Sequence, residues 1–303
     1  MNILKQGAVL AAVVLLTACG GKDGSASKEQ ASSTESAEPV VSNQTAAANQ
    51  LAMIIAARSE EQQQRDSSRH PQQTIEFFGV EPGMTIVEVL PGGGWYTQIL
   101  APYVGPEGAI YGVNYADTMW PLFGFFSEEV IAGRIAAAAT FGDTVNAFAG
   151  AEDVPARGFA FDGIDPEING TVDAVVMIRA LHNLNRFEEK AGTRTAAIKQ
   201  VYDMLKPDGF VGVVQHRAPE DSADEWANGS NGYLKQSAVI AMFEQAGFEL
   251  VASSELNANP KDQPVEGDSV WRLPPSLRTA EENKAANTAI GETDRMTLKF
   301  VKK

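Results

Sequence analysis

Short apolar runs alternate with longer amphipathic segments over most of the chain after residue 84. The runs lack polar alternation, which is typical of strands buried on both faces, and the segments between them place apolar residues at helical spacing. Because helices separate most of the strands, we predict a parallel sheet with helices on both faces. The predicted strands are 85–90, 109–114, 172–178, 210–215, 249–254 and 295–301, and the predicted helices include 96–104, 188–205 and 234–246.

The third strand has two interpretations, 158–162 and 144–148, and the first is preferred because it leaves a connection of normal length before the next strand. The last two strands have no helical pattern between them, which predicts an antiparallel edge. The segment that joins them, 257–293, is long, polar and rich in proline, so it is either a functional flap or a partly ordered insertion. The predicted fold class is therefore α/β, a Rossmann-like doubly wound, mostly parallel sheet with an antiparallel last strand.

Residues 1–18 have the pattern of a targeting segment. Lys5 supplies a positive charge, and the apolar stretch 7–16 is too short to span a bilayer. The segment ends in Leu-Thr-Ala-Cys19-Gly, which resembles the lipobox of bacterial lipoproteins. This resemblance implies that Cys19 is acylated after cleavage and anchors the protein in the cell envelope, in the outer membrane facing the periplasm. The alternative is an ordinary cleavable signal with a chance cysteine.

Residues 19–49 are rich in Ser, Ala, Gln, Glu and Thr and carry few large apolar side chains, which predicts a disordered tether. Helical spacing begins at Gln50, followed by a polar, exposed stretch over 59–66. We therefore predict one domain over 50–303, with the insertion at 257–293. Cys19 is the only cysteine in 303 residues, so disulfides and thiolate metal sites are excluded.

The overall charge is strongly acidic, with a formal net charge of -15. Binding nucleic acid requires a basic surface, and the sequence has none, so we expect no nucleic-acid partner. The acidic residues are spread along the chain, which is typical of a solvated surface.

Candidate chemistry lies where predicted strands end. In an open α/β sheet, ligands bind outside the carboxyl ends of the strands. His182 and His216 follow two of these ends and are candidate catalytic residues that accept a proton, although each could instead cap a loop by hydrogen bonding. Arg179 could bind an anionic acceptor or pair with a surface carboxylate. No histidine stands near Asp or Glu at ligand spacing, so no metal site is predicted.

The first predicted strand leads into Pro91-Gly92-Gly93-Gly94-Trp95 and then into a helix. Glycines there allow the backbone to approach a ligand closely, and the following helix presents unpaired N–H groups. With the acidic residue at 88, this stretch resembles the first motif of class I S-adenosylmethionine-dependent methyltransferases. Segments 108–114, 172–183 and 205–209 resemble later parts of the same family in the same order, and the glycine loop is similar to that of a predicted exported group.

The resemblance implies S-adenosylmethionine as the cofactor and a small molecule as the methyl acceptor. It assigns Pro91, Gly92, Gly93 and Gly94 to the loop that touches the cofactor. Three further positions carry expected roles in cofactor binding. They are Glu88 near the cofactor's amino group, Asn114 on the ribose hydroxyls in place of the usual acid, and Asp162 at the adenine.

Two aromatic residues and one departure from the motif complete the predicted site. Trp95 and Tyr96 could face the sulfonium or pack under the N-terminal helix. Leu90 stands where the family has the first glycine of the loop, which narrows the approach to it.

Three functions remain open from the sequence. The first is an active methyltransferase on a small molecule in the envelope. The second is a methyltransferase-like binding module without turnover, favoured by Leu90, by Asn114 and by the cytoplasmic origin of the cofactor. The third is a nucleotide-cofactor oxidoreductase, although its glycine fingerprint would need a glycine where Thr97 stands and an acid at 114.

Overall fold

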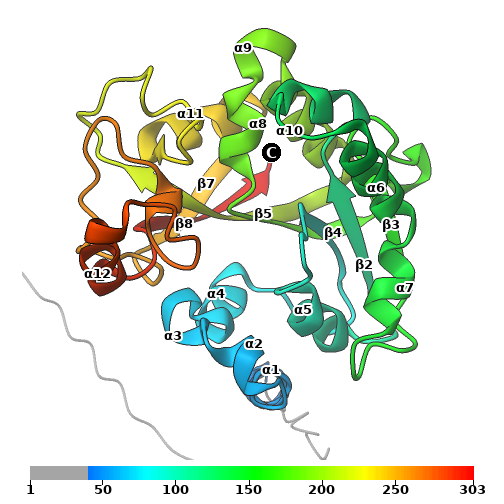
Figure 1. Cartoon of the computed structure of the whole chain (residues 1–303). Coiled ribbons are helices and arrows are strands. Elements are labelled where there is room, and N and C mark those ends of the chain that lie inside the picture. The colour runs from blue at the N-terminus through cyan, green and yellow to red at the C-terminus, as the bar shows by residue number, and fades with distance from the viewer. Residues whose placement is uncertain (1–39) are drawn as a thin grey trace, which may run out of the picture. The chain divides into compact units, whose positions relative to one another are not determined.

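The computed structural model describes residues 40–303, which form one compact unit (Figure 1). The predicted signal peptide 1–18, the acylation site Cys19 and the predicted tether up to residue 39 lie outside the described residues.

Eight strands form the central sheet, in the order β3-β2-β1-β4-β5-β8-β7, with the short β6 paired to β5. All neighbouring strands pair in parallel except β8, which is antiparallel to both β5 and β7. The predicted α/β class, a doubly wound and mostly parallel sheet with an antiparallel last strand, is confirmed. The strands are β1 Thr85–Val89, β2 Ala109–Asn114, β3 Ala156–Ala160, β4 Val172–Ile178, β5 Leu205–Ala218, β6 Leu234–Lys235, β7 Phe248–Ser254 and β8 Arg295–Lys302.

The last two strands form the predicted antiparallel edge, but the expectation that no helix lies between them is wrong. β8 is inserted between β5 and β7, so β7 forms the edge, and helix α12 (Glu281–Ile290) lies between the two strands in the chain. An interior position suits β8 because its side chains at Met296, Leu298 and Phe300 are fully buried. The preferred interpretation of the third strand is confirmed with a shift of two residues, whereas 144–148 belongs to helix α7 (Phe141–Asn146) and the turn after it.

Helices cover both faces of the sheet (Figure 1). On one face, α1, α4, α5 and α7 pack through side chains such as Leu51, Phe78 and Ile99 onto Ile86 and Val176. On the other face, α8, α10 and α11 form the second core with Val87 and Val175 and their neighbours. The remaining helix bounds are α1 Val40–Ala56, α2 Glu60–Gln63, α3 Asp66–Arg69, α4 Pro71–Phe78, α5 Thr97–Val104, α6 Glu128–Ala139, α8 Leu181–Arg186, α9 Glu188–Ala191, α10 Thr193–Met204 and α11 Gln236–Gln245.

Two predicted boundaries are corrected by the helices. α1 begins at Val40, so residues 40–49 of the predicted tether are helical. Alanine at 46–48 favours a helix, and the packed turn around Leu51 provides the anchor from which it extends. The predicted helix 188–205 is interrupted at Gly192, whose φ of 61° ends α9 and starts α10.

The insertion 257–293 is packed against the rest of the domain. The carboxylate of Asp262 is buried and accepts hydrogen bonds from Tyr233 Oη at 3.0 Å, Arg272 Nη2 at 2.8 Å and the backbone N–H of Asp294 at 3.0 Å. Its helix α12 lies at the same end of the domain as α3 (Figure 1), and Glu292 binds Arg65 there. These contacts attach the insertion to the domain, and a role as a functional flap stays a prediction.

Over residues 40–303, no helix combines the length and the apolar character needed to cross a bilayer.

Close packing of α6 on β3 gives a test of the fold. A Cβ at Gly158 would stand 1.9 Å from the backbone oxygen of Ala138, so Gly158→Ala is expected to lower the free energy of unfolding by about 1–3 kcal/mol. The control is Gly133→Ala on α6, where a Cβ meets nothing within 4 Å and the substitution is expected to add about 0.5–1 kcal/mol. Urea denaturation of the purified chain measures both, and equal midpoints would contradict this packing.

Candidate functional site

A hollow of about 380 Å³ lies beyond the carboxyl ends of β1, β4 and β5, where the sequence predicted ligand binding. Its volume is within the range of small-molecule sites, about 300–1,000 Å³. Its wall combines the glycine loop, the α2–α3 segment, the ends of two further strands and one tryptophan of the insertion. The lining residues are Arg65, Arg69, Leu90, Pro91, Gly92, Gly93, Trp95, Ile178, Arg179, His182, His216 and Trp271.

Alternate residues along the glycine loop have the left-handed backbone conformation. Gly92 and Gly94 have φ of 59° and 76°, and Leu90, at the position of the missing first glycine, has φ of 56°. A non-glycine residue in this region costs about 1–3 kcal/mol and persists only where the surrounding structure imposes it. Leu90 therefore has the same left-handed backbone conformation as the two glycines, although it is not glycine.

A second, smaller hollow of about 120 Å³ borders the same loop on the side of β2. Pro91, Gly92, Gly94 and Asn114 line it together with residues of α6 and α7. The Oδ1 atom of Asn114 accepts a hydrogen bond from the N–H of Tyr115 at 2.9 Å, which leaves its NH₂ group as a donor for a ligand. The loop and Asn114 thus fit the ribose end of a nucleoside in chemistry, although this hollow is small.

Glu88, the predicted partner of the cofactor's amino group, is buried in β1 and lines neither hollow. Its Oε2 atom accepts a hydrogen bond from Thr97 Oγ1 at 2.6 Å. Burial raises the pKa of Glu88 to about 7, while the bond from Thr97 opposes that rise. Near neutral pH its carboxyl group therefore carries only part of a negative charge, and its role in binding stays a prediction.

Asp162, predicted at the adenine, is exposed just past β3 and also lines neither hollow. Its Oδ1 atom accepts a hydrogen bond from the backbone N–H of Asp117 at 3.0 Å, at the start of the 3-10 helix η1 (Asp117–Phe123). The adjoining backbone of Phe161 binds the carbonyl oxygen of Asn114 at 3.1 Å, so Asp162 lies at the same sheet end as the predicted ribose partner.

The two candidate catalytic histidines lie side by side, with ring centroids 5.4 Å apart. His182 Nδ1 is 3.3 Å from Gln215 Oε1, and His216 Nδ1 is 2.6 Å from Thr293 Oγ1. Burial, followed by repulsion from Arg179, lowers the pKa of His182 to about 4. Burial and the neighbouring His182 also hold the pKa of His216 well below its usual value. Both imidazoles are therefore neutral at pH 7, and each has one ring nitrogen occupied by a hydrogen-bonding partner.

Trp95 and Tyr96 pack under the N-terminal helical segment, as the second of their two interpretations expected. The Trp95 ring lies 4.2 Å from Arg69 Cζ and 5.1 Å from Arg58 Cζ, and its Nε1 donates to the carbonyl of Gln62 at 3.1 Å. The buried Tyr96 donates from Oη to the carbonyl of Arg69 at 3.3 Å. The cations that face the Trp95 ring are thus arginines of the same chain.

Sequence reasoning found one of the arginines at this site and missed the others. Arg179 was singled out, whereas Arg65 and Arg69 belong to a stretch in or next to the segment predicted to be exposed. Only the folded chain shows that this stretch lies over the ends of β4 and β5.

Burial, followed by repulsion from Arg179, lowers the pKa of Arg69 to about 8. Burial and Arg65 lower that of Arg179 to about 10.

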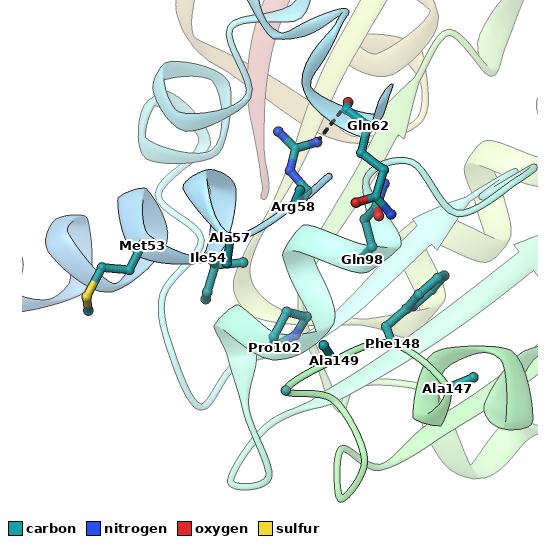
Figure 2. A pocket seen from close by; sticks show the side chains of 11 residues that line it. Met53, Ile54, Ala57, Arg58, Gln62, Gln98, Pro102, Ala147, Phe148 and Ala149 are labelled. Carbon is teal, nitrogen blue, oxygen red and sulfur yellow. Dashed lines mark hydrogen bonds between the residues drawn. The ribbon is translucent and has the colours of Figure 1, made fainter. Parts of the chain in front are cut away.

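A larger cavity of about 560 Å³ lies away from the strand ends, between α1, α5 and the turn after α7 (Figure 2). It is lined by residues such as Met53, Ile54, Pro102 and Phe148, and none of the predicted site residues belongs to it. Phe148 links the two regions, because a Cβ built on Gly94 would stand 2.9 Å from the tip of its ring. Within the described residues there is no group of three or more His, Cys, Asp or Glu that could hold a metal ion.

No protein-family model matches the sequence. No curated protein matches it either. Solved structures with a similar fold include an S-adenosylmethionine-dependent methyltransferase from Aquifex aeolicus, at 15% identity and a TM-score of 0.48, covering 83% of this chain and 97% of that one. The cyclase SpnF matches at 15% identity and a TM-score of 0.46, covering 78% and 81%.

A third similar structure is 1,6-didemethyltoxoflavin-N1-methyltransferase from Burkholderia thailandensis, solved with S-adenosylhomocysteine. It matches at 9% identity and a TM-score of 0.44, covering 88% of this chain and 92% of that one. Identities this low describe what the chain resembles in fold and assign no reaction to it.

The raised pKa of Glu88 predicts a pH-dependent loss of stability. Below pH 4.5 the carboxyl is protonated in both the folded and the unfolded chain. Between 4.5 and about 7 only the unfolded chain ionises it. The contribution of Glu88 to stability therefore falls with rising pH over this window, by about 3 kcal/mol at about 1.4 kcal/mol per pKa unit. The lowered pKa values of His182 and His216 contribute in the opposite direction, so the Glu88 contribution is measured as a difference between variants.

Glu88→Gln is expected to remove this contribution. The stability of the variant relative to wild type is therefore expected to be higher at pH 8 than at pH 4.5. The control is Glu107→Gln in an exposed turn, which is expected to leave the wild-type profile unchanged. Urea denaturation across this pH range measures the difference. A Glu88→Gln profile parallel to wild type would show that the carboxyl group is not destabilised by burial.

Proposed function

We propose that this protein is an S-adenosylmethionine-dependent methyltransferase that acts on a small-molecule acceptor. The main support is the glycine loop, because Leu90, Gly92 and Gly94 all have the left-handed backbone conformation. Leu90 and Gly92 line the 380 Å³ hollow at the strand ends, and Gly92 and Gly94 line the smaller one. The sheet supports the same proposal, because β8 is inserted antiparallel between β5 and β7. The usual dinucleotide-binding sheet runs 3-2-1-4-5-6 without such a strand.

In this proposal, the cofactor supplies an electrophilic methyl group on sulfur when it is bound. Gly92 and Gly94 give its amino-acid and ribose parts close access to the backbone, and Asn114 donates to the ribose from its NH₂ group. The protein's remaining task is to align an acceptor atom with the methyl group and to exclude water. His182 and His216 would face the acceptor as neutral groups.

The low pKa of His182 limits the acceptors that this site can serve. A base with a pKa of about 4 removes a proton slowly from a weakly acidic hydroxyl group, so an acceptor that is already nucleophilic at neutral pH suits the site better. Each histidine would then orient the acceptor by a hydrogen bond rather than deprotonate it.

A methyltransferase-like binding module without turnover is the second candidate. Two observations favour it, namely the strained leucine at the first glycine position and the Phe148 ring that lies against Gly94. An oxidoreductase has less support, because Thr97 stands at the third glycine position of its fingerprint and is bonded to Glu88.

We further propose that the protein acts in the cell envelope, anchored through Cys19 in the outer membrane and facing the periplasm. The lipobox-like sequence is the support for this part of the proposal. Metabolic labelling with a fatty-acid analogue tests it, since Cys19→Ala would lose the label and an unlabelled wild-type chain would refute the anchor.

Calorimetric titration of the purified chain with S-adenosylmethionine, S-adenosylhomocysteine and NAD separates the three functions. The methyltransferase predicts binding of the first two alone, followed by transfer of labelled methyl to an envelope extract. Binding without transfer would favour the binding module. Binding of NAD alone would overturn both.

Asn114 provides a graded test of cofactor binding. Asn114→Ala removes the donor and is expected to weaken S-adenosylhomocysteine binding roughly fivefold, the equivalent of about 1 kcal/mol. Asn114→Asp places a charged acceptor on the ribose hydroxyls and is expected to strengthen binding, because charge-assisted bonds are about twice as strong. Asn169→Ala, in the exposed turn after η2 (Pro166–Ile168), is the matched control. Unchanged affinity in both Asn114 variants would remove this residue from the site.

A further inference from the structure

The wall of the 380 Å³ hollow is rich in arginine, although the chain as a whole is strongly acidic. Arg65, Arg69 and Arg179 line it, and Arg295 adjoins them behind Glu292. The carboxylate of Glu292 is shared, since it binds Arg65 Nε at 2.6 Å and Arg295 Nη1 at 3.1 Å. One carboxylate thus serves two of the four guanidinium groups.

Among the described residues, 40–303, the other two arginines have no carboxylate partner. Arg69 is 2% exposed, and its Nε and Nη1 atoms are buried without a hydrogen-bond partner in the described part of the chain. The Nε of Arg179 is buried in the same unpaired state, as are Nη2 of Arg65 and Nε of Arg295. The sequence left two interpretations for Arg179, binding an anionic acceptor or pairing with a surface carboxylate. Among residues 40–303, Arg179 forms no pair with a carboxylate.

Such a cluster is costly unless a ligand compensates for it. A buried guanidinium loses its hydration, and an unpaired donor costs about 1–3 kcal/mol. Neighbouring positive charges add their repulsion, which appears in the lowered pKa values of Arg69 and Arg179. Buried charges in folded proteins are normally paired, so unpaired ones that line a cavity indicate a place for an anion.

Local geometry holds the guanidinium groups in place. The Arg69 group stacks on the Trp95 ring at 4.2 Å. Arg179 has φ of 59° directly after β4, a strained conformation of the kind found at functional sites. Its N–H binds the carbonyl of Val214 in β5 at 2.6 Å, which fixes the backbone beside the glycine loop. The donors are therefore positioned before any ligand arrives.

We propose that this arginine pocket, formed by Arg65, Arg69 and Arg179, binds an oxyanion of the small-molecule ligand, either a carboxylate or a phosphate. The fork of N–H donors in a guanidinium matches both groups. If the protein is the proposed methyltransferase, on which this inference rests, the methyl acceptor is anionic and its charged group enters this pocket. The neutral histidines then lie beside the uncharged part of the acceptor.

Binding of inorganic phosphate to the purified full chain tests the pocket. Wild type is expected to bind phosphate at millimolar concentration or below, and Arg179→Gln is expected to weaken that binding at least tenfold. Arg179→Lys keeps the charge without the fork and is expected to recover only part of the loss. The matched control, Arg157→Gln, removes the same charge from an exposed position on β3 and is expected to bind like wild type.

A competition experiment shows whether the pocket holds an anionic group of the acceptor or the carboxylate of the cofactor. Phosphate binding is measured in the presence of S-adenosylhomocysteine, which carries that carboxylate, or of methylthioadenosine, which lacks it. An acceptor site predicts that phosphate still binds when S-adenosylhomocysteine is saturating, and that Arg179→Gln leaves the affinity for S-adenosylhomocysteine unchanged. Competition by S-adenosylhomocysteine but not by methylthioadenosine would overturn the inference, because the pocket would then hold the cofactor's carboxylate. No phosphate binding by wild type would also overturn it.

Failure of the proposed function is distinguishable from failure of the pocket. If neither nucleoside binds while phosphate binding depends on Arg179, the methyltransferase proposal fails and the anion site stands. If Arg179→Gln does not fold, two other measurements report phosphate binding in the pocket. One is the phosphate affinity of Arg65→Gln, and the other is the NMR ring resonances of His182 and His216 in wild type. Phosphate is expected to shift both histidine resonances, and resonances that do not move would count against the pocket.

Discussion

Parallel pairing of β1, β2, β4 and β5 is the constraint from which the site follows. Parallel strands place all their carboxyl ends at one edge of the sheet, so residues more than 100 positions apart in the chain meet there. The glycine loop after β1, Arg179 after β4 and His216 in β5 all line one hollow for this reason. None of these residues would approach the others without the crossover helices that make the pairing parallel.

The pocket is completed by segments outside the parallel strands. The α2–α3 segment contributes two arginines, and the insertion contributes Trp271 and, through Glu292, an ionic contact that joins it to Arg65. These segments are far apart in the chain and meet over the strand ends. Because a loop on a rigid scaffold is free to vary, such additions are where ligand specificity is expected.

The electrostatics of the site are governed by burial more than by individual ion pairs. Loss of hydration is the first cause of the raised pKa of Glu88 and of the lowered pKa values of His182, Arg69 and Arg179. Each shift disfavours the charged form, so an empty pocket is an unfavourable place for the charges that line it. An anionic ligand would reverse part of this cost, which couples ligand binding to the charge state of the histidines.

The sequence by itself determined the order and type of most strands, because buried parallel strands appear as apolar runs bounded by turns. It also placed the glycine loop, both histidines and Arg179 at the carboxyl ends of strands, since each lies in or just after the last residues of a strand that can be recognised locally. Tertiary structure alone decided that β8 lies inside the sheet and that α1 extends back to Val40. Tertiary structure alone placed Arg65 and Arg69 in the pocket. The contact between the α2–α3 segment and the strand ends produces no hydrophobic periodicity in the sequence of either segment, so the sequence could not predict it.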